Sequence, residues 1–193
     1  VIEKDIDENR MFYVSYTKGY KPGGSNLTYG REDIVAPIVV LPTFEEEVVD
    51  AYEFGLKADI AGGRTRINSA VFFYNYEGLQ YQATDPELFQ GGVSNIAESE
   101  IYGAEVELST YVTDSMILDA NLSWIETEIT ADHFALDNVQ SDIATNALIA
   151  QGVNQFSDQV QIARAAEITN VKGNELAKTP NFTANLALTW EGF

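Results

Sequence analysis

The segment Tyr102–Val112 reads YGAEVELSTYV, and its side chains alternate between two kinds. One set is mostly apolar and consists of Tyr102, Ala104, Val106, Leu108, Thr110 and Val112. The other consists of Gly103, Glu105, Glu107, Ser109 and Tyr111. A β-strand places successive side chains on opposite faces, whereas a helix would scatter both sets around its circumference. The segment therefore predicts a strand with one apolar and one polar face.

Three other segments repeat this pattern. Asp50–Asp59 places Tyr52, Phe54, Leu56 and Ala58 opposite Glu53, Gly55, Lys57 and Asp59. Leu118–Trp124 places Leu118, Ala120, Leu122 and Trp124 opposite Asp119, Asn121 and Ser123. Phe182–Trp190 places Phe182, Ala184, Leu186, Leu188 and Trp190 opposite Thr183, Asn185, Ala187 and Thr189. Each of the three is predicted to be a strand with one apolar face.

Two more segments, Arg10–Tyr20 and Thr65–Tyr81, are rich in aromatic and β-branched residues, which favours strands. Their facing is ambiguous. In the second segment Ile67, Val71 and Phe73 compete with Ala70, Phe72, Tyr74 and Tyr76 for the apolar face. The sequence thus predicts about six strands in all.

The connections between these strands alternate in length. Residues 21–47, 82–97 and 131–180 form long connections, and residues 60–64 and 113–115 form short turns. If neighbouring strands are antiparallel, all short turns lie at one end, as in outer-membrane barrels. A compact soluble domain seldom carries a connection as long as 131–180 without structure of its own. We expect two helices there: Asp142–Gln151, capped by Ser141 and ended by Gly152, and Asp158–Ala166, capped by Ser157.

Composition excludes several classes of protein. The 193 residues include 30 acidic and 11 basic side chains, a net charge of −19 that would repel nucleic acid. A hydrophobic fraction of 45% argues against a disordered chain. The absence of cysteine and the single histidine, His133, argue against a thiolate or multi-histidine metal site and a Ser-His triad. We therefore expect neither an enzyme nor a cofactor. The sequence contains no stretch of ~20 continuously apolar residues, which a membrane-spanning helix would require.

Several motifs resemble one family in order and spacing. Tyr13–Gly24 (YVSYTKGYKPGG) resembles the "YxSYxxGxKxGG" segment of TonB-dependent outer-membrane receptors. Tyr52–Lys57 (YEFGLK), followed by Gly62-Gly63-Arg64, is similar to their "YExGxK…GR" strand and turn, and Phe72–Gln80 resembles the next strand. Asn95 followed by Gly103–Leu108 resembles their "N…GxExE" strand, and Thr179–Phe182 resembles the entry to a later strand. The resemblance covers most of the chain and is nearest to the iron-complex receptors.

This resemblance implies an all-β fold, an antiparallel up-and-down transmembrane β-barrel segment. The family's barrel has roughly 22 strands around a plug, so residues 1–193 would be a partial barrel domain without the plug domain. The implied function is active transport across the outer membrane of a Gram-negative bacterium. The implied partners are outer-membrane lipid, a ferric siderophore or similar ligand, and the TonB energy-coupling protein, which acts through the missing plug.

In such a barrel the two faces of each strand have different surroundings. The polar face would line the lumen and present Glu53, Lys57, Glu105, Glu107, Asp119 and Asn121. Lys57 is expected to pair with Glu53. The apolar face would meet lipid through Tyr52, Phe54, Leu56, Val106, Leu108, Leu122, Trp124, Leu186 and Trp190, with the aromatic residues forming interfacial girdles.

Two alternatives share much of this pattern. A passive porin has the same alternation and loop asymmetry, and only the series of family motifs argues against it. A soluble β-sandwich, such as a lectin or adhesin, would bury the apolar faces against each other and leave the carboxylates as ordinary solvated residues. Dependence on detergent would separate the sandwich from both membrane proteins.

Overall fold

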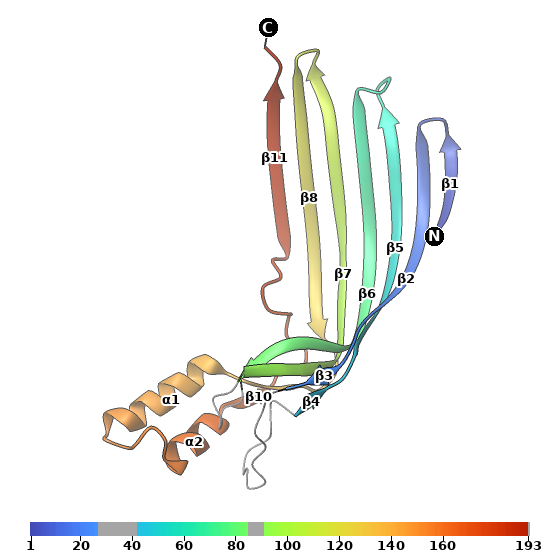
Figure 1. Ribbon diagram of the computed structural model, residues 1–193. Helices are drawn as coiled ribbons and strands as arrows, with labels where there is room; N and C mark the ends of the chain where they lie inside the picture. Colours follow the sequence, from blue (N-terminus) through green and yellow to red (C-terminus); the bar gives the residue numbers. More distant parts are fainter. Residues whose placement is uncertain (27–41, 85–90, 193) are drawn as a thin grey trace.

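The computed structural model describes residues 1–26, 42–84 and 91–192, and its main element is one antiparallel sheet of seven strands (Figure 1). The strands are β1 (Ile2–Asp7), β2 (Arg10–Lys21), β5 (Glu47–Ile60), β6 (Thr65–Thr84), β7 (Gly91–Thr113), β8 (Met116–Ile129) and β11 (Phe182–Trp190). They lie side by side in chain order, each antiparallel to the next. This is the predicted up-and-down sheet, open at β1 and β11.

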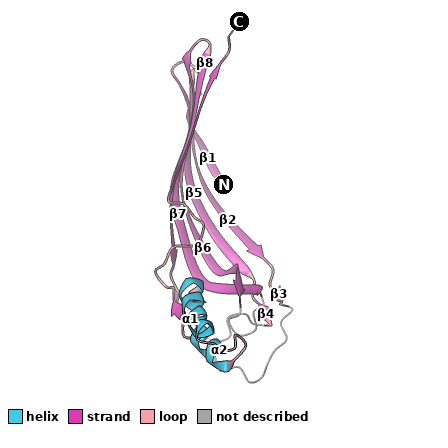
Figure 2. Cartoon of the chain, turned by 90° about the vertical axis from the view of Figure 1, so that its left-hand side faces the viewer, coloured by secondary structure: helices cyan, strands magenta, loops and turns pink. Residues whose placement is uncertain are grey.

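The sheet is a single twisted layer (Figure 2). Among the described residues, no second sheet or helix stacks over the faces of the seven strands as a layer, and the packing of Ile168 against Ala83 is confined to the outer end of β6. Phe54 is 50% exposed and Leu186 is 69% exposed. A β-sandwich would bury these side chains against a second sheet, so the sandwich alternative does not describe this fold.

Short turns join the strands at one end of the sheet (Figure 1). In the turn between β5 and β6, Ala61, Gly62 and Gly63 have φ values of 54°, 69° and 84°. Glycine adopts this left-handed region at little cost, so the two glycines suit the turn. Arg64 Nη1 lies 2.8 Å from Asp114 Oδ1 and links this turn to the turn between β7 and β8. The long connections from β2 to β5 and from β8 to β11 lie at the opposite end, as predicted, whereas β6 and β7 are separated by residues 85–90 alone.

Two predictions about the strands were wrong. The N-terminal strand β1 was missed, because its sequence IEKDID is mostly charged and only pairing with β2 makes it a strand. Residues 82–97 were predicted to be a connection, but β6 continues to Thr84 and β7 begins at Gly91. The two strands remain paired from Leu79↔Ile96 outward, and this β6–β7 extension bends away from the sheet (Figure 1).

The pairing register settles the two ambiguous segments. Val14 lies opposite Phe54 and Phe54 lies opposite Val71, so these three side chains share a face. Phe73 lies opposite Tyr52 on the same face, whereas Phe72 lies opposite Glu53 on the other. The apolar face and the polar face that were predicted for β5 therefore each extend across β2 and β6.

Both helices lie in the connection between β8 and β11. They are α1 (Asn138–Ala150) and α2 (Asp158–Ala165), between the short strands β9 (Phe134–Leu136) and β10 (Ile168–Asn170). The predicted start of the first helix was wrong: Asp137 caps it by accepting hydrogen bonds from Val139 and Gln140, and Ser141 is buried inside it. Gly152 follows the helix with φ 88°, as expected.

The second predicted helix is present, and Ser157 occupies its N-cap position without making a side-chain capping hydrogen bond. Neither α1 nor α2 is long and apolar enough to cross a membrane.

Candidate functional site

The pairing register places all the predicted lumen-facing residues on one face of the sheet and all the predicted lipid-facing residues on the other. Glu107 lies opposite Asn121, Asp119 lies opposite Ser109, and Glu105 lies opposite Ser123. This set shares the polar face with Glu53 and Lys57. The opposite face carries Tyr52, Phe54, Leu56, Val106, Leu108, Leu122, Trp124, Leu186 and Trp190. The sheet thus has one polar and one apolar face across its strands.

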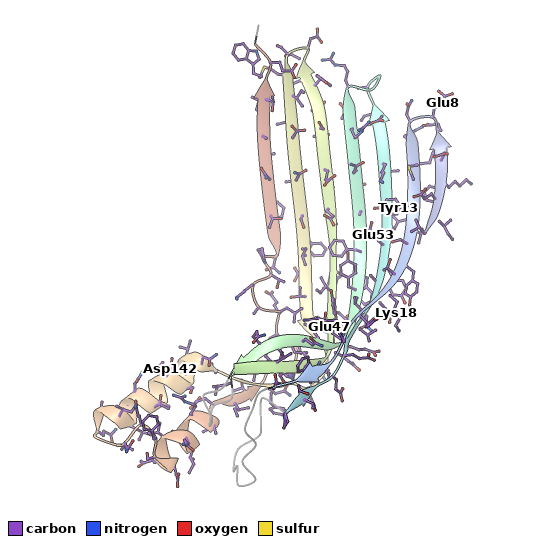
Figure 3. The ribbon with its side chains drawn as sticks, viewed as in Figure 1. Glu8, Tyr13, Lys18, Glu47, Glu53 and Asp142 are labelled. Atoms are coloured by element: carbon purple, nitrogen blue, oxygen red, sulfur yellow. The ribbon has the colours of Figure 1, made fainter. Side chains whose placement is uncertain are left out.

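Tyr13 of β2 lies beside Glu53 of the neighbouring strand β5 on the polar face (Figure 3). Its hydroxyl donates a hydrogen bond to Glu53 Oε1, and Lys57 Nζ lies 5.4 Å from the centre of its ring. The expected pairing of Lys57 with Glu53 is therefore wrong. Residues four apart in a strand are separated by about 13 Å along the chain, and the tyrosine from β2 fills the space between them.

Gly55 allows this arrangement. A Cβ atom at Gly55 would lie 2.2 Å from the Tyr13 ring, so the ring lies directly over the glycine backbone. Ala70 lies opposite Gly55 on the other side, and Glu105 lies opposite Ala70 on the next strand. The row of residues that contains Glu105 therefore continues through two small residues, while Phe72 lies directly opposite Glu53.

A hollow of about 270 Å³ opens at this place. Its lining includes the carboxylates of Glu53, Glu105 and Glu107 and one ammonium group, that of Lys57. Asn68 Nδ2 donates to Glu107 Oε2 at 3.2 Å, while no described residue donates a hydrogen bond to Glu105. Three carboxylates beside one base form a site suited to a cationic side chain or ligand group. Among the described residues, no three acidic or histidine side chains are placed to hold a metal ion.

The apolar face ends in a row of aromatic rings. Ring centres lie 5.2 Å apart for Tyr16 and Tyr52, 6.5 Å for Tyr52 and Phe73, and 6.0 Å for Tyr102 and Trp124. One step further from the turns, the same face becomes charged: Lys18 lies opposite Asp50, and Glu100 lies opposite Glu128. Trp190 lies near the turn end, on the nine-residue strand β11. An apolar band between aromatic rows is typical of a bilayer-facing surface.

Sequence reasoning missed the part played by β2. Tyr13 and Tyr16 occur in the quoted motif, but their opposite facing was not assigned. The signal was present, because Met11, Tyr13, Ser15 and Thr17 alternate with Phe12, Val14, Tyr16 and Lys18. Only the second set contains a run of apolar residues, and this set lies on the same face of the sheet as Phe54.

His133 joins the helical connection to the β6–β7 extension. Its Nε2 atom lies 2.8 Å from the Tyr81 hydroxyl, and the two rings meet edge to face. The backbone carbonyl of His133 accepts a hydrogen bond from Val171, beside the β9–β10 pair. Burial lowers the pKa of His133 below its usual 6.5 and raises the pKa of Tyr81.

Acidification is expected to loosen this contact. Because the docked imidazole has a lowered pKa, the undocked state binds the proton more readily. The stabilisation of the docked state of His133 is complete above pH 6.5. It is lost as the pH falls through this value toward the lowered pKa of the docked imidazole. Amide hydrogen-exchange protection of Val171, compared at pH 7.5 and 5, measures it. The His133→Gln variant should lack this pH dependence, and an unchanged dependence would contradict the assignment to His133.

Comparison with known proteins agrees with this geometry. The profile of the family described as "TonB dependent receptor-like, beta-barrel" matches residues 5–193. The probable TonB-dependent siderophore receptor PiuA of Acinetobacter baumannii is 26% identical over 125 residues, which are 64% of this chain and 16% of that protein. The solved structure of PiuA matches with a TM-score of 0.60 at 20% identity and covers 97% of this chain and 22% of its own.

A second solved structure, the ferric yersiniabactin uptake receptor FyuA of Yersinia pestis, matches with a TM-score of 0.58 at 17% identity. It covers 96% of this chain and 21% of its own. At these identities the two structures establish the fold alone, and the chain spans less than a quarter of each relative's length. The family match extends over nearly the whole chain. The chain belongs to the family of TonB-dependent receptor-like β-barrels, a family of receptors and not of enzymes.

Proposed function

We propose that residues 1–193 form part of the wall of an outer-membrane barrel, with the polar face toward the lumen and the apolar face toward lipid. The alternation of the two faces across the strands supports this orientation. Hollows of about 270 and 200 Å³ are lined mainly by polar-face residues, and the exposed aromatic row lies on the other face. A strand of nine residues, such as β11, is long enough to cross a bilayer when tilted.

The wall belongs, in this proposal, to a transporter that captures a ferric siderophore and imports it with TonB-coupled energy. Membership of the receptor family carries this proposal, and it is supported by the matched relatives, which are siderophore receptors. The long connections, with β3, β4 and both helices, would form the exterior side that meets the ligand. The same membership argues against a passive porin.

The hollow beside Tyr13 would receive a cationic side chain of the plug. Glu53 and Glu105 both line this hollow, together with Ala70 of the strand between them. A guanidinium group fits such a pair of carboxylates, because it donates several hydrogen bonds in a fixed plane. In the proposed transporter this contact would hold the plug against the wall until TonB acts.

Uptake of ⁵⁵Fe-labelled siderophores by whole cells tests the function. The full-length protein that contains this chain would be expressed in a Gram-negative strain without its own siderophore receptors, with and without TonB. We expect saturable uptake of at least one ferric siderophore only where TonB is present. TonB-independent entry of small solutes would instead indicate a porin, and no uptake of any ferric siderophore would contradict the proposal.

The Glu53 and Glu105 site predicts a separate effect. Replacing both residues by glutamine removes the charges but keeps the side-chain volume, so the barrel should insert normally while uptake falls. Because a charge-assisted contact contributes about 1.5–3 kcal/mol, we expect roughly a tenfold or larger loss. The matched control is Asp119→Asn, on the same face near the turns. Equal uptake by the double variant and wild type would contradict a role for the pair.

A further inference from the structure

The outer part of β7 has an edge that no described strand covers. The strand β8 pairs with β7 only from Ser99 to Thr113, whereas β7 extends out to Gly91. The strand β6 pairs with the other edge of β7 along the extension. Unpaired backbone N–H and C=O groups along an edge are costly when buried and invite pairing with another chain.

The side chain of Asn26 covers this edge at Val93. Asn26 Nδ2 donates to the Val93 carbonyl at 2.8 Å, and Val93 N–H donates to Asn26 Oδ1 at 2.9 Å. In an antiparallel pair, a residue gives both backbone groups to its partner or turns both away. Both groups of Val93 bond to Asn26, so they turn away from its β6 partner, Gln82. The carboxamide therefore occupies the place of a peptide group in an added strand.

Asn95, two residues along the same strand, makes a matching pair of bonds. Glu45 N–H donates to Asn95 Oδ1 at 2.9 Å, and Asn95 Nδ2 donates to the Glu45 carbonyl at 3.1 Å. Asn95 Nδ2 also donates to the Gly78 carbonyl at 2.6 Å, which fixes the side chain against β6. Gln80 Nε2 adds bonds of 3.0 Å to the Pro22 carbonyl and 2.9 Å to the Glu45 carbonyl.

These bonds hold both arms of one small hairpin. Its strands are β3 (Gly24–Ser25), which Asn26 follows, and β4 (Thr43–Phe44), which Glu45 follows. The hairpin approaches the bend of β6 closely, since a Cβ atom at Gly78, where φ is 67°, would lie 2.5 Å from the Glu46 carbonyl oxygen. The hairpin is thus attached to the extension mainly through side-chain amides.

We propose that Asn26 and Asn95 are positioning residues: their carboxamides replace a backbone ladder between the β3–β4 hairpin and β7. They thereby fix the position of Asn26 against the wall, and Asn26 N–H also donates to the Pro42 carbonyl at 2.8 Å, which holds Asn26 and Pro42 together. The proposal rests on the proposed function only in placing this end of the sheet on the cell exterior. Its test does not depend on transport.

Amide hydrogen exchange of the full-length protein in detergent tests it. Asn95→Leu removes all three bonds at similar volume, and Asn95→Asp keeps only the bond accepted from Glu45. We expect exchange of the Glu45 amide to be about tenfold faster in Asn95→Leu and intermediate in Asn95→Asp. Asn26→Leu should do the same to the Val93 amide. Amides of Tyr52–Asp59 in β5 should be unchanged, as should all of these in the control Asn185→Leu, whose side chain makes no hydrogen bond with any described residue.

A pH profile separates positioning from a general loss of packing. In Asn95→Asp, protonation of the introduced carboxyl restores one donor, so protection of the Glu45 amide should recover on acidification. Unchanged exchange at Glu45 and Val93 would overturn the proposal. An equal loss of protection in β5 would also overturn it, because the two asparagines would then be required for the fold and not for the placement of the hairpin.

Discussion

Replacing Leu122 by arginine is expected to lower the free energy of unfolding of the full-length protein in lipid vesicles by about 2–4 kcal/mol. Leu122 lies in the middle of the apolar face, opposite Val106 and Ala184, and is 42% exposed in the isolated sheet. In a barrel this exposure is to lipid, where an arginine near the bilayer midplane costs about this much. Equilibrium unfolding in urea, followed by tryptophan fluorescence, measures the change.

The matched control lies one residue away. Asn121 is on the polar face, opposite Glu107 and Asn185. Arginine at position 121 would lie in the lumen beside a carboxylate, so the free energy of unfolding should change by less than about 1 kcal/mol. Equal losses for both variants would contradict the assignment of the faces, and a larger loss for the Asn121 variant would invert it.

Trypsin added to intact cells is expected to cut the full-length protein after Lys172 and to leave Arg64 intact. Both side chains are about half exposed, at 53% and 47%. Lys172 lies in the long connection between β8 and β11, and Arg64 lies at the short turn between β5 and β6, at the opposite end of the sheet (Figure 1). Long connections of outer-membrane barrels face the exterior and short turns face the periplasm.

Broken membranes provide the control for this cleavage. Trypsin then reaches both ends, so fragments ending at Arg64 should appear together with those ending at Lys172. Cleavage of intact cells at Arg64 alone would invert the topology. Mass spectrometry of the fragments distinguishes these outcomes.

The alternation of apolar and polar side chains predicted those strands whose two faces differ clearly in polarity. Phe182–Trp190 was bounded as the structure has it, and Tyr102–Val112 lies within β7. Such segments specify their own facing, because a slip of one residue would exchange their apolar and polar sides. The missed strand β1 shows this pattern only weakly, since a lysine separates its two isoleucines on the apolar side, and it depends on backbone pairing with β2.

The extension of β6 and β7 could not be predicted from local sequence. It contains Gly91, Gly92 and Asn95, residue types that favour turns. Pairing between the two strands, together with the hydrogen bonds of Asn26 and Gln80, holds it extended. Its strands form through tertiary contacts that override local preference.

The candidate site was predicted in part. Glu53, Glu105 and Glu107 were assigned to one face from alternation, and the register agrees. The partner of Glu53 was not found, because Tyr13 is 40 residues away in the chain and comes beside it only through the β2–β5 register. The start of the first helix could not be predicted from local sequence either. Asp137 and Ser141 are both suitable N-cap residues, and it is packing that buries Ser141 inside the helix and leaves Asp137 as the cap.

Oxygen accessibility of single spin labels tests the orientation of the wall most directly. Labels would be placed in turn at Val106, Glu107 and Leu108 of the full-length protein in lipid vesicles. We predict high accessibility to oxygen, which concentrates in the bilayer, at positions 106 and 108 and low accessibility at 107. A water-soluble nickel chelate should show the reverse. Equal accessibility at all three positions would contradict a wall with one face in lipid and the other in the lumen.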